Sequence, residues 1–405
     1  MWARADAVLP GGVMYLSRSA DAAGRGVLPG FIESGDGCRV TDVDGKGYID
    51  FLCANGPILL GYGHPEVEAA VAEQHAAATS ASLYPPALVE LAERLTGRTD
   101  GMEWAVAAKN GSDVVALALR TAREATGRSK VVQFDAAYHG FAPELTPSGV
   151  GVPAAARSDV VRSRWNDAEH LVHVAREHAD QLAAIVLNPV DQTMASPTVD
   201  PTPEFIAAIE RVRAETGALL VFDDVRHGFR LHPDGSHRRV GVQPDLLCLG
   251  KALGNGHPIA ALLGTEALRT AASHLWFTAT MCFEAASMRA AITTLDVYER
   301  DGAFDRIDRA ARRLRDGIVG AAASTGHDLA YTGPPATPSI VFADDPRSRV
   351  ARRFAAEAAH RGAIFHPTLN WFVNAAHDDA AIDEAVGIAA AALAATPEPA
   401  AFYPV

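Results

Sequence analysis

The middle of the chain alternates short apolar runs with polar loops that contain glycine. Residues 219–222 and 246–249 are two such runs, and each has the length and composition of a buried strand. Similar runs predict further strands at 104–107, 131–134 and 184–187. Polar loops follow the first two runs, at 223–228 and 250–252. In a parallel sheet, ligands bind in loops beyond the carboxyl ends of the strands, so these two loops are the first candidates for a site.

Helical spacing of apolar residues alternates with these strands. It covers 65–79, 86–98 and about 284–298, and a further helix is predicted to start within 109–113 and to run to about 125. The flanking regions differ from this pattern. Residues 1–30 are expected to form an irregular arm, 30–51 a β meander, and 302–405 alternating helices and strands. We therefore expect an N-terminal arm and meander at 1–60 that belong to a small domain, a large domain at 61–300, and a C-terminal small domain at 301–405.

The composition is that of a soluble globular protein, with 48% hydrophobic and 21% charged residues in 405. This length suits a large and a smaller domain. A net charge of -13 without a basic block argues against nucleic acid as a partner. No apolar stretch is long enough to span a membrane, and no signal peptide is recognisable at the N-terminus, so we expect a cytoplasmic protein. The four cysteines show neither metal-ligand nor disulfide spacing, and Cys248 and Cys282 are expected to be buried thiols.

One of the four lysines stands apart from the others. Lys46, Lys109 and Lys130 lie in polar stretches and are expected to be solvated, whereas Lys251 directly follows a hydrophobic strand. Desolvation there favours a neutral, nucleophilic amine, although a lysine that extends from the edge of the core to solvent fits the same position. Asp223 ends the neighbouring predicted strand. A Schiff-base amine and a carboxylate that keeps a pyridine nitrogen protonated are what a pyridoxal phosphate site needs.

Three motifs surround these two residues: the run VFDDVRHGFR at 221–230, the pair Pro244-Asp245, and the run LGKALGNG at 249–256. Together they resemble the class III aminotransferases, which are pyridoxal phosphate enzymes of fold type I. The subgroup that looks most similar contains glutamate-1-semialdehyde 2,1-aminomutase and its aminotransferase relatives. The resemblance covers nearly the whole chain. It implies a mostly parallel central sheet with helices on both faces, a smaller α+β domain, and pyridoxal 5'-phosphate as cofactor.

The resemblance also implies roles for individual residues. Lys251 and Asp223 match the catalytic positions. The cofactor-binding positions fall on Gly111, Ser112, Tyr138, His139, Asn188, Asp223, Val225, Arg226, Lys251 and Thr280.

Gly111 and Ser112 match the phosphate-binding turn, although glycine and serine at a helix start also suit ordinary capping. Tyr138 matches the aromatic ring that stacks on the cofactor, and Val225 the apolar residue beneath it. His139 is expected to orient Asp223 and not to act as an acid or base. Thr280 aligns with the residue that binds the phosphate of the neighbouring subunit, which implies a homodimer with shared sites. An ordinary turn threonine is the alternative.

Several positions depart from the family pattern. Asn188 stands where relatives typically have glutamate, and Asp224 replaces the usual glutamate. Arg226 occupies a position commonly held by glutamine or by a small or apolar residue. It is expected either to pair with Asp224 or to reach the phenolic oxygen of the cofactor, and neutral drift explains the changes equally well.

Two residues are candidates for substrate binding. Arg18 follows a Pro-Gly-Gly-Val segment that resembles the carboxylate-binding arm of the aminomutases, and Asn55 takes the place of a tryptophan near the substrate. A solvated arginine in the arm is the alternative for Arg18. The region 368–371 offers no arginine for the same task.

These observations favour a pyridoxal phosphate-dependent aminotransferase that moves an amino group from an amino-acid donor to an oxo or aldehyde acceptor, for example an oxidised amino sugar. A 2,1-aminomutase or epimerase with the same cofactor is the first alternative. A non-catalytic cofactor-binding protein on the same fold is the second, and the presence of both Lys251 and Asp223 argues against it.

Overall fold

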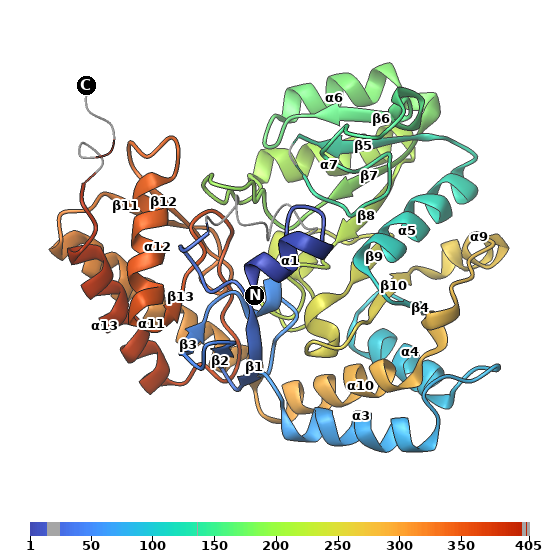
Figure 1. The fold of residues 1–405 in the computed structure, drawn as a ribbon. Helices are drawn as coiled ribbons and strands as arrows, with labels where there is room; N and C mark the ends of the chain where they lie inside the picture. Colours follow the sequence, from blue (N-terminus) through green and yellow to red (C-terminus); the bar gives the residue numbers. More distant parts are fainter. Residues whose placement is uncertain (14–24, 136, 399–401, 403–405) are drawn as a thin grey trace. The chain divides into compact units, whose positions relative to one another are not determined.

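The computed structural model describes residues 1–13, 25–135, 137–398 and 402, which form two compact units (Figure 1). Unit 1 comprises Met1–His64, Gln192–Val199 and Arg300–Val405. Unit 2 comprises Pro65–Asp191 and Asp200–Glu299.

Unit 2 is built on a seven-stranded sheet with the strand order β4-β10-β9-β8-β7-β5-β6. Its strands are β4 (Trp104–Ala108), β5 (Lys130–Phe134), β6 (Val160–Ser163), β7 (Leu182–Leu187), β8 (Leu219–Asp223), β9 (Leu246–Leu249) and β10 (Ala260–Gly264). β10 pairs antiparallel with both of its neighbours, whereas the pairs among β9, β8, β7, β5 and β6 are all parallel. The strands predicted from the apolar runs, and the mostly parallel sheet that the resemblance implies, are therefore confirmed.

Burial explains why these strands read as continuous apolar runs. Every residue of β7, β9 and β10 is buried, as expected for inner strands of a sheet that is covered on both faces. Cys248 and Cys282 belong to the same core as β4, β7 and β9, so the expectation of buried thiols is confirmed.

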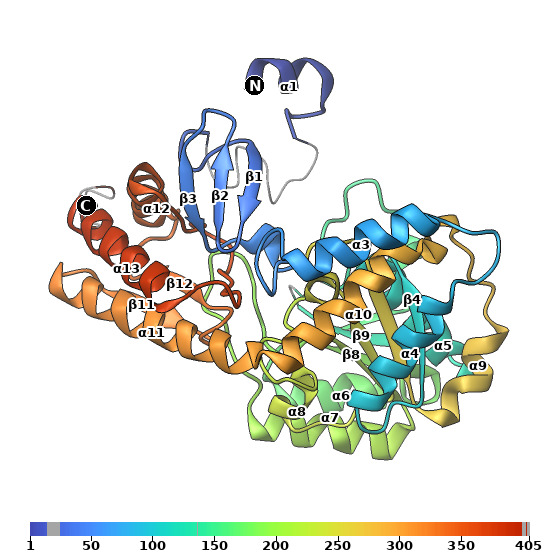
Figure 2. The same ribbon diagram turned by 90° about the horizontal axis from the view of Figure 1, so that it is seen from below.

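The helices of unit 2 are α3 (Pro65–Ala77), α4 (Pro86–Arg98), α5 (Gly111–Thr126), α6 (Ala168–Glu177), α7 (Pro203–Thr216), α8 (Ser236–Val240), α9 (Arg269–His274) and α10 (Ala285–Arg300). α5 packs against β9 and β10 through a buried apolar face, and α6 packs against α7. α3 and α10 run side by side in both views (Figures 1 and 2). α5 begins within the predicted stretch 109–113, shortly after the end of β4, and its first turn therefore lies near the carboxyl ends of the parallel strands.

Unit 1 contains a four-stranded sheet and a two-stranded hairpin. The sheet has the order β1 (Ile32–Asp36), β2 (Arg39–Asp42), β3 (Gly47–Asp50) and β13 (Ala363–Ile364), and the hairpin joins β11 (Leu329–Thr332) to β12 (Ser339–Phe342). The predicted meander corresponds to the first three strands. β13 adds to it in parallel from a distant part of the chain.

The helices of unit 1 are α1 (Trp2–Val8), α11 (Ala303–Ser324), α12 (Arg349–Arg361) and α13 (Asp379–Ala394). The aromatic rings of Phe354, Phe365 and Trp371 stack in its core, where Phe365 and Trp371 have centroids 4.4 Å apart. The expectation that residues 1–30 are wholly irregular is wrong, because α1 forms there and buries Ala5. Within the described parts of both units, every helix is too short or too polar to cross a bilayer.

Candidate active site

The two polar loops singled out in the sequence lie side by side in unit 2. β8 and β9 are parallel neighbours, and Asp223, the last residue of β8, is in register with Cys248. Lys251 follows three residues later, at the start of a 3₁₀ turn, Lys251–Gly254. Asp223 and Lys251 therefore leave the sheet at the same edge, which is the edge where ligands bind in open α/β folds.

The Asp223 carboxylate is buried and held at both oxygens. His139 Nδ1 lies 2.8 Å from Asp223 Oδ2, and the backbone N–H of Val225 donates to Asp223 Oδ1 at 3.2 Å. Asn188 Nδ2 donates to the backbone carbonyl of Asp223 at 3.3 Å. Three separate loops thus fix this residue. His139 Nε2 is buried and has no hydrogen-bond partner in the part of the chain that the structure describes.

Lys251 has an unusual backbone conformation. Its φ is +43°, in the left-handed region that residues other than glycine rarely adopt. Such strain costs about 1–2 kcal/mol and tends to persist at functional positions, where the surrounding structure holds it.

Gly111, in the first turn of α5, packs against Val225 in the loop after Asp223. A Cβ added to Gly111 would lie 2.6 Å from Val225 Cγ1, and one added to Gly250 would lie 3.2 Å from the same atom. The Val225 side chain therefore fits between the start of α5 and the residue before Lys251. Only glycine at position 111 permits this approach without displacing Val225.

Residues 138–141 pack against the same turn. Ser112 Oγ accepts a hydrogen bond from the backbone N–H of Phe141 at 3.0 Å, and a Cβ on Gly140 would lie 2.6 Å from Ser112 Oγ. The Tyr138 side chain is 60% exposed. Burial of part of this side chain and the nearby Asp223 charge raise the pKa of its phenol.

Arg226 and Asp224 have separate environments. The Asp224 carboxylate is fully buried and accepts a hydrogen bond from the backbone N–H of Ser236 at 2.7 Å, and burial raises its pKa to about 7. Burial lowers the pKa of the Arg226 guanidinium to about 10, and its Nε has no partner among the described residues. The described structure contains no ion pair between Arg226 and Asp224. The first of the two expectations for Arg226 is therefore wrong, because Asp224 points instead to the start of α8.

Two of the remaining predicted residues lie in other turns of the described chain, and one lies outside it. Thr280 is exposed and begins a 3₁₀ turn, Thr280–Phe283, directly before α10. Asn55 lies in unit 1, in a turn where Cys53, Ala54 and Asn55 all have positive φ, of 47°, 56° and 68°. Asp50 stabilises that turn by accepting hydrogen bonds from the backbone N–H groups of residues 52 and 53. Arg18 lies outside the described residues.

The expectation that Lys109 is solvated is wrong. Its side chain is only 12% exposed, and its Nζ lies 2.8 Å from Glu284 Oε2. Lys109 precedes the first turn of α5, and Glu284 lies just after the Thr280 turn. The sequence carried no signal for this pair, because the two residues are 175 positions apart.

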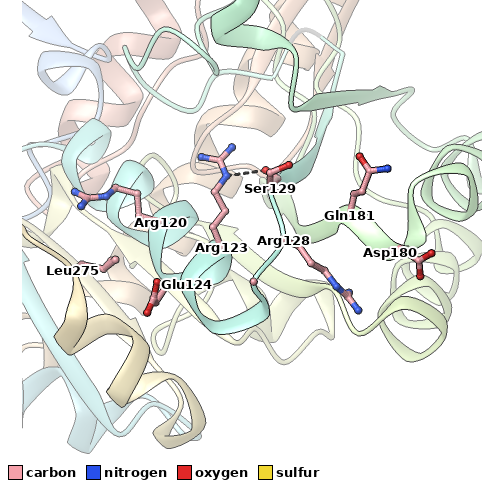
Figure 3. A pocket seen from close by; sticks show the side chains of 9 residues that line it. Arg120, Arg123, Glu124, Arg128, Ser129, Asp180, Gln181 and Leu275 are labelled. Atoms are coloured by element: carbon pink, nitrogen blue, oxygen red, sulfur yellow. Dashed lines mark hydrogen bonds between the residues drawn. The ribbon is translucent and has the colours of Figure 1, made fainter.

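A surface groove of about 570 Å³ lies at the other end of α5, which is about 24 Å long. Arg120, Arg123 and Arg128 line it (Figure 3). Arg123 pairs with Glu144 and donates to the carbonyl of Ser129, while Arg120 and Arg128 donate to other backbone carbonyls. Since these guanidinium groups already have protein partners, the groove is a poor candidate for the site.

The residues at the β8–β9 edge have the chemistry that pyridoxal phosphate requires. They provide an amine after a strand, a buried carboxylate, a helix that begins with glycine, and an exposed aromatic ring. This combination defines a pyridoxal phosphate-dependent transferase.

Comparison with known proteins gives the family. Residues 21–329 match the model of the class-III aminotransferases. The chain is 37% identical over 374 residues to an aminopentol aminotransferase of Sphingopyxis macrogoltabida, an alignment that covers 92% of this chain and 88% of the relative. It is 31% identical over 409 residues to a glutamate-1-semialdehyde 2,1-aminomutase of Desulfitobacterium hafniense, which covers 94% of each chain.

A solved structure, the pyridoxal phosphate internal aldimine form of the FumI protein of Sphingopyxis sp. MTA144, matches with a TM-score of 0.93 at 36% identity. The match covers 97% of this chain and 95% of the other. The chain belongs to the class-III aminotransferases, whose cofactor is pyridoxal phosphate. The predicted family, fold class and cofactor are confirmed.

Proposed function

We propose that this chain transfers an amino group from an amino-acid donor to an oxo or aldehyde acceptor, with Lys251 and Asp223 as catalytic residues. The proposal is carried by one arrangement: Val225, two residues after the buried Asp223, fits between Gly111 and the residue before Lys251. In this proposal the helix start that binds the phosphate, the loop after the ring-nitrogen partner and the residue before the Schiff-base amine meet around one side chain, that of Val225.

The protein groups have distinct tasks in this proposal. Pyridoxal phosphate, when bound, supplies an aldehyde that combines with amines and a ring that withdraws electrons. Asp223, held by His139, stabilises a proton on the ring nitrogen. Lys251 Nζ would hold the cofactor covalently until the substrate amine displaces it, and the freed amine would then take a proton from the substrate carbon and return it. Proton transfer by a positioned base is typically worth ~100- to 10,000-fold in rate.

Other residues bind and orient the cofactor. The backbone N–H groups of Gly111 and Ser112, at the positive end of the α5 dipole, bind the phosphate. Tyr138 and Val225 would hold the cofactor ring through apolar and aromatic contacts. Arg226 forms no ion pair with a carboxylate in the described structure. Its guanidinium is therefore proposed to bind the phenolic oxygen of the cofactor, which was the second expectation for this residue. Asn188 acts through the backbone of Asp223.

Borohydride trapping tests the assignment of Lys251. Reduction of the cofactor-loaded protein, followed by digestion and mass spectrometry, should place a phosphopyridoxyl group on Lys251 and on none of Lys46, Lys109 and Lys130. Lys251→Ala should lose both the label and the turnover while it keeps its thermal midpoint, because this side chain contributes little packing. A label on another lysine would contradict the proposed site.

We also propose a cytoplasmic homodimer in which Thr280 binds the phosphate of the partner's cofactor. Trp276 and Met281 flank Thr280 and are 83% and 61% exposed. Large apolar side chains exposed near one another in sequence support a protein interface at this segment.

Three classes of substrate fit this proposal. One similar protein is named an aminopentol aminotransferase and another an aminomutase, so amino polyols join amino acids and oxidised amino sugars as candidates. A donor–acceptor screen with mass spectrometry of the products would separate the alternatives. Turnover that requires both a donor and an acceptor supports an aminotransferase, whereas isomerisation of a single substrate supports an aminomutase.

A further inference from the structure

Lys109 and Glu284 form a largely buried ion pair that joins two functional segments of unit 2. Lys109 Nζ lies 2.8 Å from Glu284 Oε2, and the two side chains are 12% and 15% exposed. Lys109 also approaches the backbone carbonyl of Glu284 at 3.4 Å. The lysine lies between β4 and the first turn of α5, and the glutamate lies between the Thr280–Phe283 turn and α10.

The Glu284 carboxylate also fixes the start of α10. It accepts hydrogen bonds from the backbone N–H groups of Ala286 and Ser287, at 2.8 and 3.1 Å, and from Ser287 Oγ at 2.6 Å. Although burial raises the pKa of this carboxyl, the hydrogen bonds from Lys109 and Ser287 and the Lys109 charge lower it to about 2. Glu284 is therefore ionised at neutral pH and provides a charged partner for Lys109 within the protein.

The positions of the two residues suggest a role beyond stability. Lys109 is two residues before Gly111, the start of the proposed phosphate-binding turn. Glu284 is four residues after Thr280, which in the proposed dimer serves the partner's phosphate. Because buried charge pairs are rigid, a shift of one segment would displace the other.

We propose that the Lys109–Glu284 pair is a positioning device for phosphate binding, which sets the Gly111–Ser112 turn and the Thr280 turn relative to each other. The inference rests on the proposed function and adds two residues that act through others. In a dimer with shared sites, the pair connects the turn that binds one cofactor's phosphate to the turn that binds the other's.

The test compares pyridoxal 5'-phosphate with pyridoxal, which lacks the phosphate. Dissociation constants for both are measured by fluorescence quenching on the full chain, with wild type, Lys109→Met, Glu284→Gln and the double variant. Each single change should weaken pyridoxal phosphate binding by about 10-fold, the effect of one lost buried charged hydrogen bond. Binding of pyridoxal should be unchanged, and the double variant should be no weaker than the worse single variant.

A second ion pair on the same helix provides the control. Arg123 and Glu144 meet at 2.6 Å at the far end of α5, with side chains 24% and 22% exposed. Arg123→Met and Glu144→Gln should lower the thermal midpoint, as the Lys109 and Glu284 changes do, but leave the preference for pyridoxal phosphate over pyridoxal intact. Glu284→Gln is isosteric, and its single amide oxygen can still accept either the Ala286 N–H or the Ser287 N–H, although not both. It provides a second variant in case Lys109→Met fails to fold.

The Thr280 half of the proposal is tested by combining Thr280→Ala with Glu284→Gln. If Glu284 acts partly by placing Thr280, the two effects on pyridoxal phosphate binding should be less than additive. Fully additive effects would contradict the link to the Thr280 turn. An unchanged preference for the phosphate in both single variants, or a loss in Lys109→Met alone, would overturn the positioning role. A wild-type protein without a label on Lys251 would instead contradict the proposed function.

Discussion

His139 Nδ1 lies 2.8 Å from Asp223 Oδ2, and the side chains are 0% and 6% exposed. The other carboxylate oxygen accepts the backbone N–H of Val225. The plane of the carboxylate is therefore set from two sides, by one group on the β5 side of the sheet and one on its own loop. A buried carboxylate whose direction is fixed in this way is suited to hold one proton at one place.

Replacing His139 should destabilise the protein more than replacing a buried histidine without such a bond. His139→Phe leaves one oxygen of a buried carboxylate without its partner, which should lower the free energy of unfolding by about 1–3 kcal/mol. His237→Phe is the matched control, because His237 is equally buried and neither of its ring nitrogens has a partner among the described residues. Urea denaturation of both variants measures the difference. Equal losses would show that the His139–Asp223 hydrogen bond contributes nothing to the free energy of unfolding beyond the packing of the imidazole ring.

The sequence was sufficient for the parts of the fold and site that depend on local pattern. The apolar runs predicted the parallel strands, and the placement of Lys251 and Asp223 after neighbouring strands brought both to one edge of the sheet. The sequence did not predict contacts between distant segments of the chain. Nothing near Lys109 in the sequence indicates Glu284, and the contact of Asp224 with Ser236 depends on how the loop after β8 folds back.

Sharing of active sites across a dimer predicts complementation between inactive subunits. Lys251→Ala and Thr280→Ala subunits each lack one part of a site, but a mixed dimer contains one site with both residues intact. Random mixing makes half of the dimers mixed, so activity should recover to about a quarter of the wild-type value. Measurements of turnover after unfolding and refolding the two variants together would show this.

The control mixture uses Lys251→Ala with Asp223→Asn. Both residues belong to the same subunit's site, so no mixed dimer has an intact site and activity should stay at the background. Recovery in this mixture, or none with Thr280→Ala, would contradict the shared arrangement.

Arg18 is predicted to bind the carboxylate of the amino donor, although it lies outside the described residues. Loss of a bidentate, charge-assisted contact in Arg18→Ala should cost ~2–4 kcal/mol, or roughly thirty- to a thousandfold in the half-reaction with an amino acid. An acceptor without a carboxylate should be affected much less in its own half-reaction. Stopped-flow absorbance measures the two separately, with Arg4→Ala in the exposed helix α1 as control. If neither half-reaction slows, Arg18 is a surface residue.

Asp224 should make the stability of the protein depend on pH between about 4 and 7. Burial raises the pKa of this carboxyl from its ordinary value of 3.8 to about 7, against the opposing effect of the Ser236 hydrogen bond. Over this range the folded chain keeps a proton that the unfolded chain has lost. The contribution of Asp224 to stability is therefore greatest below about pH 4 and is lost as the pH rises through 7.

Asp224→Asn should flatten this dependence. Asparagine does not titrate, and its Oδ1 can still accept the hydrogen bond from the Ser236 N–H, so the folded structure is retained. The variant should be at least as stable as wild type at pH 8. Between pH 5 and 7 its free energy of unfolding should fall less steeply than that of wild type, and the two slopes should differ by at most about 1.4 kcal/mol per pH unit. Asp245→Asn is the control, because it removes a carboxylate that is partly exposed and already paired with Arg213. Urea denaturation at several pH values gives the slopes. If the curves of wild type and Asp224→Asn run parallel, the Asp224 carboxyl releases its proton as readily in the folded chain as in the unfolded one, and water or a neighbouring charge must compensate its burial.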